Sequence, residues 1–149
     1  MCSRPEAFAL QAYAAAGPLH AALAALEGLP ASADDWHTHG TLLTSSLTGD
    51  AAAAAAPESL LATDSTMAVR IYHLYLPIYY FVRSRVLEHR AGARPGALAV
   101  GLSAPQGCGK TTLVDLLVEL FAADGLSCAA VSIDDFYLTG SEQVTNNDR

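Results

Sequence analysis

The chain has 149 residues, which is enough for about one domain. Its formal net charge of −7 and the lack of any Lys and Arg cluster exclude a protein that grips a nucleic-acid backbone. Three cysteines without a Cys-x-x-Cys spacing, Cys2, Cys108 and Cys128, indicate a reducing compartment and exclude a disulfide framework and a zinc site.

Targeting signals are weak. No apolar run reaches the roughly 18 residues that a membrane-spanning helix needs. The first residues lack the charged and then apolar segments of a secretory signal, whereas an organelle transit peptide stays open. The sequence therefore predicts a protein of the cytoplasm or the chloroplast that is neither secreted nor bound to a membrane.

Residues 1–57 are predicted to form an alanine-rich, partly disordered extension. Residues 1–30 favour one or two helical segments broken at Gly17-Pro18. Residues 31–57 mix Ser, Thr, Asp and Gly with a six-alanine run, which is typical of a linker or a poorly ordered surface segment. The pair His37 and His39 resembles a metal site only superficially, because no Cys or further His stands nearby.

Residues 58–96 are predicted to form a helical segment followed by a connector. Apolar residues between Ile71 and Val86 recur at three-four spacing, and Pro77 is expected to kink or restart the helix. Four tyrosines lie in this stretch: Tyr72, Tyr75, Tyr79 and Tyr80. A platform on which nucleotide bases stack is one interpretation of them, but their helical spacing beside Ile and Leu favours a place in the core or on a partner-facing surface.

Residues 97–149 are predicted to be a truncated P-loop kinase domain. The apolar runs 97–102 and 128–133 are typical of strands buried on both faces. Between them, residues 111–123 place Val114, Leu117, Val118 and Phe121 on one helical face. The predicted fold is therefore α/β, a three-layer P-loop NTPase fold with a parallel sheet, of which only the first βαβ unit is present, preceded by an α-helical region.

The segment Ala104-Pro-Gln-Gly-Cys-Gly-Lys-Thr111 carries the strongest signal. It matches the phosphate-binding P-loop pattern, with Ala104 in place of the first glycine. Glycines let the main chain wrap closely round an anion, and amide N–H groups at the start of the following helix favour negative charge. Lys110 is the only lysine of the chain, and it stands where a compact ammonium reaches into a phosphate cradle.

Each position of this loop has a predicted role. Lys110 is expected to reach the β- and γ-phosphates of ATP, and the Thr111 hydroxyl to ligate Mg²⁺. The predicted nucleotide-binding residues are Gln106, Gly107, Cys108, Gly109, Lys110, Thr111 and Thr112. Cys108 is either a small filler or, since inward amides lower a thiol pKa, a redox-sensitive group.

An acidic pair follows the second predicted strand, at the sheet edge where ligands of α/β folds bind. A carboxylate of Asp134 or Asp135 there is suited to accept the proton of an attacking hydroxyl or to hold Mg²⁺ through water. The alternative is a pair of solvated acids that cap a turn.

The two motifs, Gly101 to Thr112 and Ser132 to Thr139, resemble the glycerate 3-kinase family. The resemblance covers roughly residues 67–143 and includes the stretch from Arg70 to Ile78. It implies ATP as phosphoryl donor, Mg²⁺ as cofactor and D-glycerate as acceptor. It further implies that Asp134 is the catalytic base or metal-side acid, beside the catalytic Lys110, and that Asp135 and Tyr137 lie near the substrate.

The sequence also bears on functions other than this kinase activity. A GTPase needs an Asn-Lys-x-Asp signature, which Lys110 as the only lysine does not allow. The bare chemistry fits uridine or pantothenate as acceptor as well as D-glycerate. A complete P-loop kinase needs about five parallel strands, so a truncated chain that binds nucleotide without catalysis is the other expectation.

Overall fold

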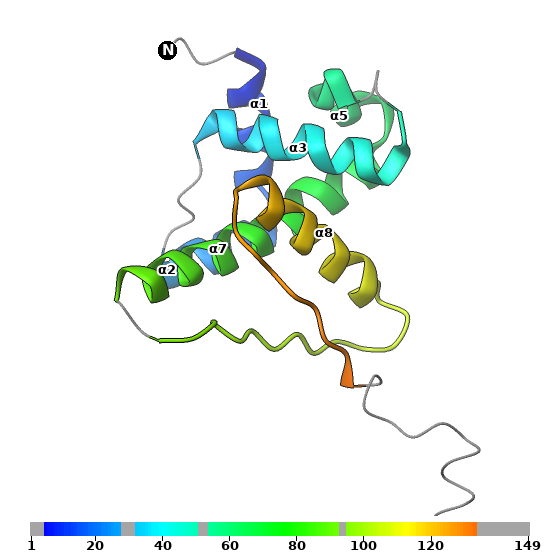
Figure 1. Ribbon diagram of the computed structural model, residues 1–149. Coiled ribbons are helices and arrows are strands. Elements are labelled where there is room, and N and C mark those ends of the chain that lie inside the picture. The colour runs from blue at the N-terminus through cyan, green and yellow to red at the C-terminus, as the bar shows by residue number, and fades with distance from the viewer. Residues whose placement is uncertain (1–4, 28–31, 51–53, 93–94, 134–149) are drawn as a thin grey trace, which may run out of the picture.

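The computed structural model describes residues 5–27, 32–50, 54–92 and 95–133 (Figure 1). In this part of the chain the regular structure is helical, and no strand is present. The elements in chain order are α1 (Pro5–Ala15), α2 (Pro18–Glu27), α3 (Ala33–Thr48), η1 (Pro57–Ser59), α5 (Leu60–Thr63), α6 (Ser65–Ala68), η2 (Val69–Tyr75), α7 (Leu76–Ala91) and α8 (Lys110–Ala123).

The structure confirms the predicted break between two N-terminal helices, but it contains a helix where a linker was predicted. Helices α1 and α2 flank Gly17, and a proline in the first turn of α2 suits a helix start. Helix α3 lies within the stretch expected to be a linker, so that prediction is wrong for Ala33–Thr48. Its start is fixed by a capping box, in which Ser32 accepts from the amide of Asp35 and the Asp35 carboxylate accepts from the amide of Ser32.

The predicted restart at Pro77 is confirmed, and it has a local cause. Proline lacks an amide hydrogen and so removes one i→i−4 bond from the helix. The preceding segment, η2, is a π-helix, in which the Leu76 amide donates to the carbonyl of Ile71, five residues earlier. Helix α7 then begins at Leu76 and carries Pro77 in its first turn.

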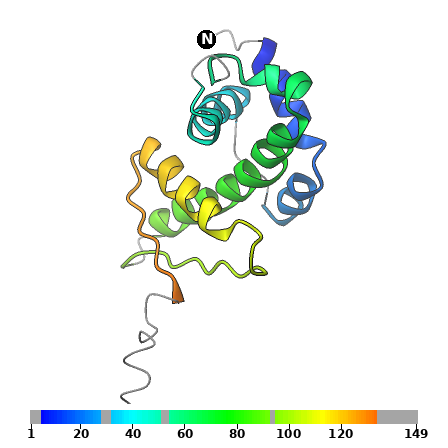
Figure 2. The ribbon, with the colours of Figure 1, turned by 90° about the vertical axis from the view of Figure 1, so that its right-hand side faces the viewer.

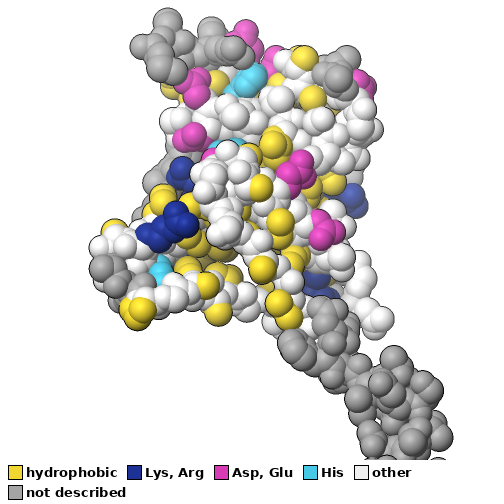
Figure 3. Space-filling model, viewed as in Figure 1, with side chains coloured by type: hydrophobic (Ala, Val, Ile, Leu, Met, Phe, Trp, Pro, Cys, Tyr) yellow, Lys and Arg dark blue, Asp and Glu magenta, His cyan; other side chains and the backbone are white. Residues whose placement is uncertain are grey.

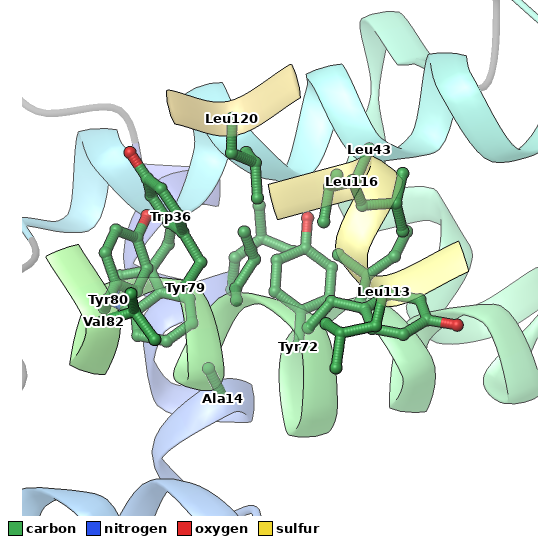
Figure 4. Packing of buried hydrophobic residues seen from close by; sticks show 14 of the residues in the cluster. Ala14, Trp36, Leu43, Tyr72, Tyr79, Tyr80, Val82, Leu113, Leu116 and Leu120 are labelled. Carbon is green, nitrogen blue, oxygen red and sulfur yellow. The ribbon is translucent and has the colours of Figure 1, made fainter. Parts of the chain in front are cut away.

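One apolar cluster joins these helices (Figure 4). Trp36 of α3 is 1% exposed, and its ring packs edge-on against Tyr80 of α7 with centroids 4.7 Å apart. The four tyrosines of the helical segment are buried, which confirms that they belong to the core. Helix α8 closes the cluster and lies against α3 and α7 in both ribbon views (Figures 1 and 2).

Helix α8 has the predicted length but a different buried face. It buries Leu113, Leu116, Leu120 and Phe121. Of the predicted face only Phe121 is buried, while Val114, Leu117 and Val118 are half-buried. Apolar residues occur on more than one face of this helix, so their periodicity alone does not identify the face that packs against the core.

The predicted α/β fold with a parallel sheet is wrong for the described residues. Residues 97–102 and 127–132 form no strand, and they run along the outside of the helical body (Figures 1 and 2). The side chains of Val100, Val131 and Ile133 are 56%, 71% and 74% exposed. A strand requires a neighbouring strand to pair with its amide and carbonyl groups, and the described residues include no strand. The βαβ unit is therefore absent here.

None of the described helices is long and apolar enough to cross a bilayer. The predicted division into residues 1–57, 58–96 and 97–149 stays a prediction. The core cluster includes residues from all three stretches, from Leu10 to Leu126.

Candidate functional site: the phosphate loop

The predicted phosphate loop lies between the exposed segment 97–103 and the first turn of α8. Gly107 and Gly109 have φ angles of 77° and 86°, in the left-handed region that glycine adopts without strain. A Cβ atom at either position would meet no other atom within 4 Å. The backbone conformation, rather than lack of space, therefore accounts for the two glycines in this structure.

Lys110 holds the start of this loop. Its ammonium donates to the carbonyl oxygens of Ala104 and Pro105, both at 2.8 Å. These bonds draw the loop round the side chain, so the positive charge lies against the loop. An ammonium carries three donors and is suited to bridge loop carbonyls and an incoming anion.

The N-terminus of α8 has no side-chain cap. Gly109 is the N-cap residue, and the bond from the Leu113 amide to its carbonyl, at 3.0 Å, starts the helical ladder. The amides of the first turn therefore have no helical partner and sit at the positive end of the helix dipole. The Cys108 amide differs, because it donates to the Pro105 carbonyl at 3.4 Å.

The structure brings the predicted nucleotide-binding residues together in one loop and one helical turn. Lys110 is half-buried, and the others are exposed: Gln106, Gly107, Cys108, Gly109, Thr111 and Thr112. An open loop, followed by a first helical turn whose amides have no helical partner and beside one ammonium, is chemically suited to an anion with several oxygens, such as a phosphate chain.

The acidic part of the predicted site falls elsewhere. Asp134, Asp135 and Tyr137 lie outside the described residues, so their catalytic, metal-binding and substrate-binding roles stay predictions. Among the residues that the structure does describe, no group of three or more His, Cys, Asp or Glu side chains could hold a metal ion.

The two histidines of α3 have separate surroundings. The Nε2 atom of His37 lies 3.9 Å from a carboxylate oxygen of Glu58. His39 is buried, and its Nδ1 and Nε2 atoms lie 2.8 Å from the Tyr80 hydroxyl and 3.2 Å from Asp124. They therefore do not form a metal pair.

A polar cluster at the other end of α8 escaped the sequence analysis. We call it the Asp124 junction, and it consists of His39, Tyr79, Tyr80, Arg83 and Asp124. The Tyr79 hydroxyl and the Arg83 Nε atom each donate to one Asp124 oxygen at 2.5 Å. The signal in the sequence is faint: Tyr79 and Arg83 are four residues apart and so share a helix face.

Burial and hydrogen bonding compete at Asp124. Burial alone raises the pKa of its carboxyl group, but the bonds donated by Tyr79, Arg83 and His39 outweigh it and lower that pKa below its usual value. Burial, together with the neighbouring Asp124 carboxylate, raises the pKa of the Tyr79 hydroxyl. The carboxylate is therefore ionised at neutral pH, and the tyrosine is a neutral donor.

A groove also lies between α3 and α8, away from the phosphate loop. Its volume is about 520 Å³, and threonine and serine side chains of α3 line it together with Glu119. Because the groove is open and lies along α8 away from Lys110, we assign it no part in phosphate binding.

Comparison with known proteins supports the resemblance. The chain is similar to "D-glycerate 3-kinase, chloroplastic" of Arabidopsis thaliana, with 42% identity over 78 residues. The match covers 50% of this chain, which spans 17% of the length of that relative. No protein-family profile matches the chain, and no solved structure does. The predicted relationship to glycerate 3-kinases is therefore confirmed over about half of the chain.

Proposed function

We propose that the chain binds the phosphate tail of ATP at residues 106–112 and takes part in transfer of the γ-phosphoryl group to D-glycerate, giving 3-phosphoglycerate. The observation that carries the proposal is the arrangement at Lys110. An ammonium is folded against a loop with two left-handed glycines, at the uncapped start of a helix. Similarity to a D-glycerate 3-kinase supports the kinase activity and the acceptor.

Lys110 and the main-chain amides share the binding of the anion in this proposal. The amides at the start of α8 donate to phosphate oxygens, and Lys110 exchanges a loop carbonyl for a β- or γ-oxygen. Charge-assisted hydrogen bonds of this kind are worth about 1.5–3 kcal/mol each. They hold the triphosphate in place and stabilise the charge on its oxygens during transfer.

The residues present fit a magnesium ion that arrives with the nucleotide. Magnesium is usually held by one or two protein oxygens together with phosphate oxygens and water, rather than by a protein cage. The Thr111 hydroxyl, exposed in the first turn of α8, is suited to be one such ligand, with Asp134 as the proposed second. Bound there, the ion neutralises phosphate charge.

The acceptor side of the reaction is assigned to the acidic pair. The Asp134 carboxylate accepts the proton of the attacking D-glycerate hydroxyl, while Asp135 and Tyr137 contact the rest of the acceptor. These roles follow from the resemblance, and the same chemistry serves uridine or pantothenate. The acceptor is therefore one of the variables of the test.

A second candidate function is binding of a nucleotide without turnover. The exposure of Val100, which precedes the phosphate loop, and of Val131, which follows α8, favours it. An active kinase excludes water from the reacting phosphate, whereas the described residues leave this loop open. Binding and turnover are therefore measured separately.

The compartment is part of the same proposal. The name of the Arabidopsis relative places that protein in the chloroplast, and we extend this location to the present chain. Import of a fluorescent fusion of the full chain into isolated chloroplasts tests the assignment, and retention outside the organelle contradicts it.

The test combines calorimetry with a coupled kinase assay on the full chain. Mg-ATP is expected to bind, and Lys110→Ala to weaken binding by about 10-fold to 100-fold, the loss of one charged hydrogen bond. Turnover with D-glycerate, but not with uridine or pantothenate, supports the acceptor. Binding without turnover selects the second candidate.

Arg90→Ala is the matched control, since it removes an exposed positive charge on α7 outside the loop. Equal loss of binding in both variants would indicate a general effect of charge. Wild-type chain that binds no Mg-ATP would refute both candidates.

A further inference from the structure

The Asp124 junction sets a negative charge at the unfavourable end of a helix. Asp124 is the C-cap residue of α8, where the helix dipole is itself negative. Alone, a carboxylate there is destabilising. Its position is explained by three donors from outside α8: the Tyr79 hydroxyl and Arg83 Nε of α7, and His39 Nε2 of α3.

The direction of the hydrogen bonds in this junction follows from the ionised carboxylate. A carboxylate only accepts, so the hydrogen of the bond between His39 and Asp124 is carried by Nε2 of His39. The Nδ1 atom of the same ring lies 2.8 Å from the Tyr80 hydroxyl. A chain of hydrogen bonds thus runs from α7 through α3 to the end of α8, and its central imidazole is buried.

Aromatic packing joins the junction to the core. The Tyr79 ring lies edge-on to Phe121 of α8 with centroids 5.1 Å apart, and the Tyr80 ring lies against Trp36. Figure 4 shows Tyr79, Tyr80 and Trp36 gathered at the end of the cluster near Leu120. A shift of α8 at Asp124 therefore disturbs both rings.

The two ends of α8 are held differently. The helix has 14 residues, about 21 Å at 1.5 Å per residue. At its last turn the junction ties it to α3 and α7, and at Glu119 it accepts from Ser46 of α3 over 2.5 Å. In the first turn, by contrast, Lys110 donates side-chain bonds to its own loop. Leu113 and Leu116 pack the first half of α8 on the core through apolar contacts, whereas its last turn is also tied to α3 and α7 by side-chain hydrogen bonds.

We infer that Asp124 is a positioning residue for the phosphate loop. Through His39, Tyr79 and Arg83 it fixes the direction of α8 on the helical body, and so the place of the amides at the opposite end of that helix. The effect on ligand affinity rests on the proposed function, whereas the docking of α8 does not. The two are therefore measured apart.

The affinity experiment uses Asp124→Asn in the full chain. The amide keeps the size of the side chain but removes its charge and one of its two acceptor oxygens. Mg-ATP and inorganic pyrophosphate are titrated by calorimetry at a temperature where circular dichroism shows each variant fully folded. We expect affinity to fall about 10-fold, as for the loss of one charged hydrogen bond. Because the folded fraction is held constant, a merely stabilising role leaves the affinity unchanged.

Ser46→Ala is the matched control. It removes the other side-chain bond of α8 to α3, which is exposed, and leaves the junction intact. Wild-type affinity in this variant together with weakened binding in Asp124→Asn supports the inference. Wild-type affinity in both, or equal loss in both, would overturn it.

Hydrogen exchange separates this inference from the proposed function. If the wild type binds neither Mg-ATP nor pyrophosphate, the proposed function fails and takes the predicted affinity change with it. Amide exchange over Leu116 to Phe121 then decides whether the junction holds α8. Exchange about 10-fold faster in Asp124→Asn than in Ser46→Ala supports this docking, and equal exchange in the two variants overturns it.

Discussion

The helical body and the two extended segments, residues 97–102 and 127–133, are both rich in apolar residues, but the buried apolar core lies almost wholly in the helices. Trp36, Tyr79 and Leu120 are at most 1% exposed, while Val100 and Val131 are more than half exposed. Figure 3 shows hydrophobic side chains at the surface of one face of the molecule. Helices satisfy their own backbone groups, so they need only side-chain partners. Extended segments also need partners for the backbone. In this chain, apolar composition therefore predicts burial better in the helices, which complete their own backbone hydrogen bonds, than in the extended segments.

The difference in burial between the two regions is tested most directly by truncating one apolar side chain in each. Trp36→Ala removes a buried indole that packs on Tyr80 and should lower the free energy of unfolding by about 3–5 kcal/mol. Val131→Ala changes an exposed side chain and should stay within about 0.5 kcal/mol. Urea unfolding followed by circular dichroism measures both, and equal losses would show that the exposed segment is packed in solution.

Replacing a glycine by alanine in each region tests the same difference in packing with a single added methyl group. A Cβ at Gly40 in α3 would lie 2.0 Å from the Tyr72 hydroxyl, so Gly40→Ala forces the buried ring or the helix to move. We expect a loss of about 1–3 kcal/mol, as for other overpacked cores.

Gly101 is the matched position in the extended segment. A Cβ there meets nothing within 4 Å, and its φ angle lies outside the left-handed region. Gly101→Ala should therefore leave the unfolding midpoint unchanged or raise it slightly, because alanine restricts the unfolded chain. A large loss in this variant would mean that residues 97–102 pack more tightly than the structure describes.

The sequence predicted local features well. The break at Gly17, the restart at Pro77 and the end of α8 at Asp124-Gly125 each depend on the conformation of one or two residues, which their chemistry dictates. The loop glycines and Lys110 were found in the same way, since a spacing of a few residues defines the motif.

Features that depend on distant partners were missed. The segments 97–102 and 128–133 have the composition of strands, but pairing depends on neighbours that composition does not reveal. Helix α3 was missed because Ser, Thr and Asp dominate it, although its capping box and the spacing of Trp36, His39 and Leu43 favour a helix. The Asp124 junction unites residues 41 to 85 positions apart, which no local pattern links.

The capping box of α3 gives a smaller effect within the helical body. Ser32→Ala removes the acceptor for the Asp35 amide and should reduce the free energy of unfolding by about 1 kcal/mol. Ser59 is the matched control, because it precedes α5 but its side chain makes no capping bond. Thermal unfolding of Ser32→Ala and Ser59→Ala compares them, and equal midpoints would show that the box does not stabilise α3.

The smallest expected effect is the response of the Asp124 junction to acid. Hydrogen bonds lower the pKa of Asp124 in the folded chain, so its contribution to stability is complete above the unfolded pKa, whose usual value is 3.8, and is lost as pH falls through the lower folded pKa. The loss is modest, because a protonated carboxyl group keeps an acceptor oxygen and the site is partly exposed to solvent. Urea midpoints from pH 6 to pH 3 should fall less steeply in Asp124→Asn than in the wild type. Parallel profiles would mean that hydrogen bonds from Tyr79, Arg83 and His39 do not stabilise the ionised carboxylate in solution.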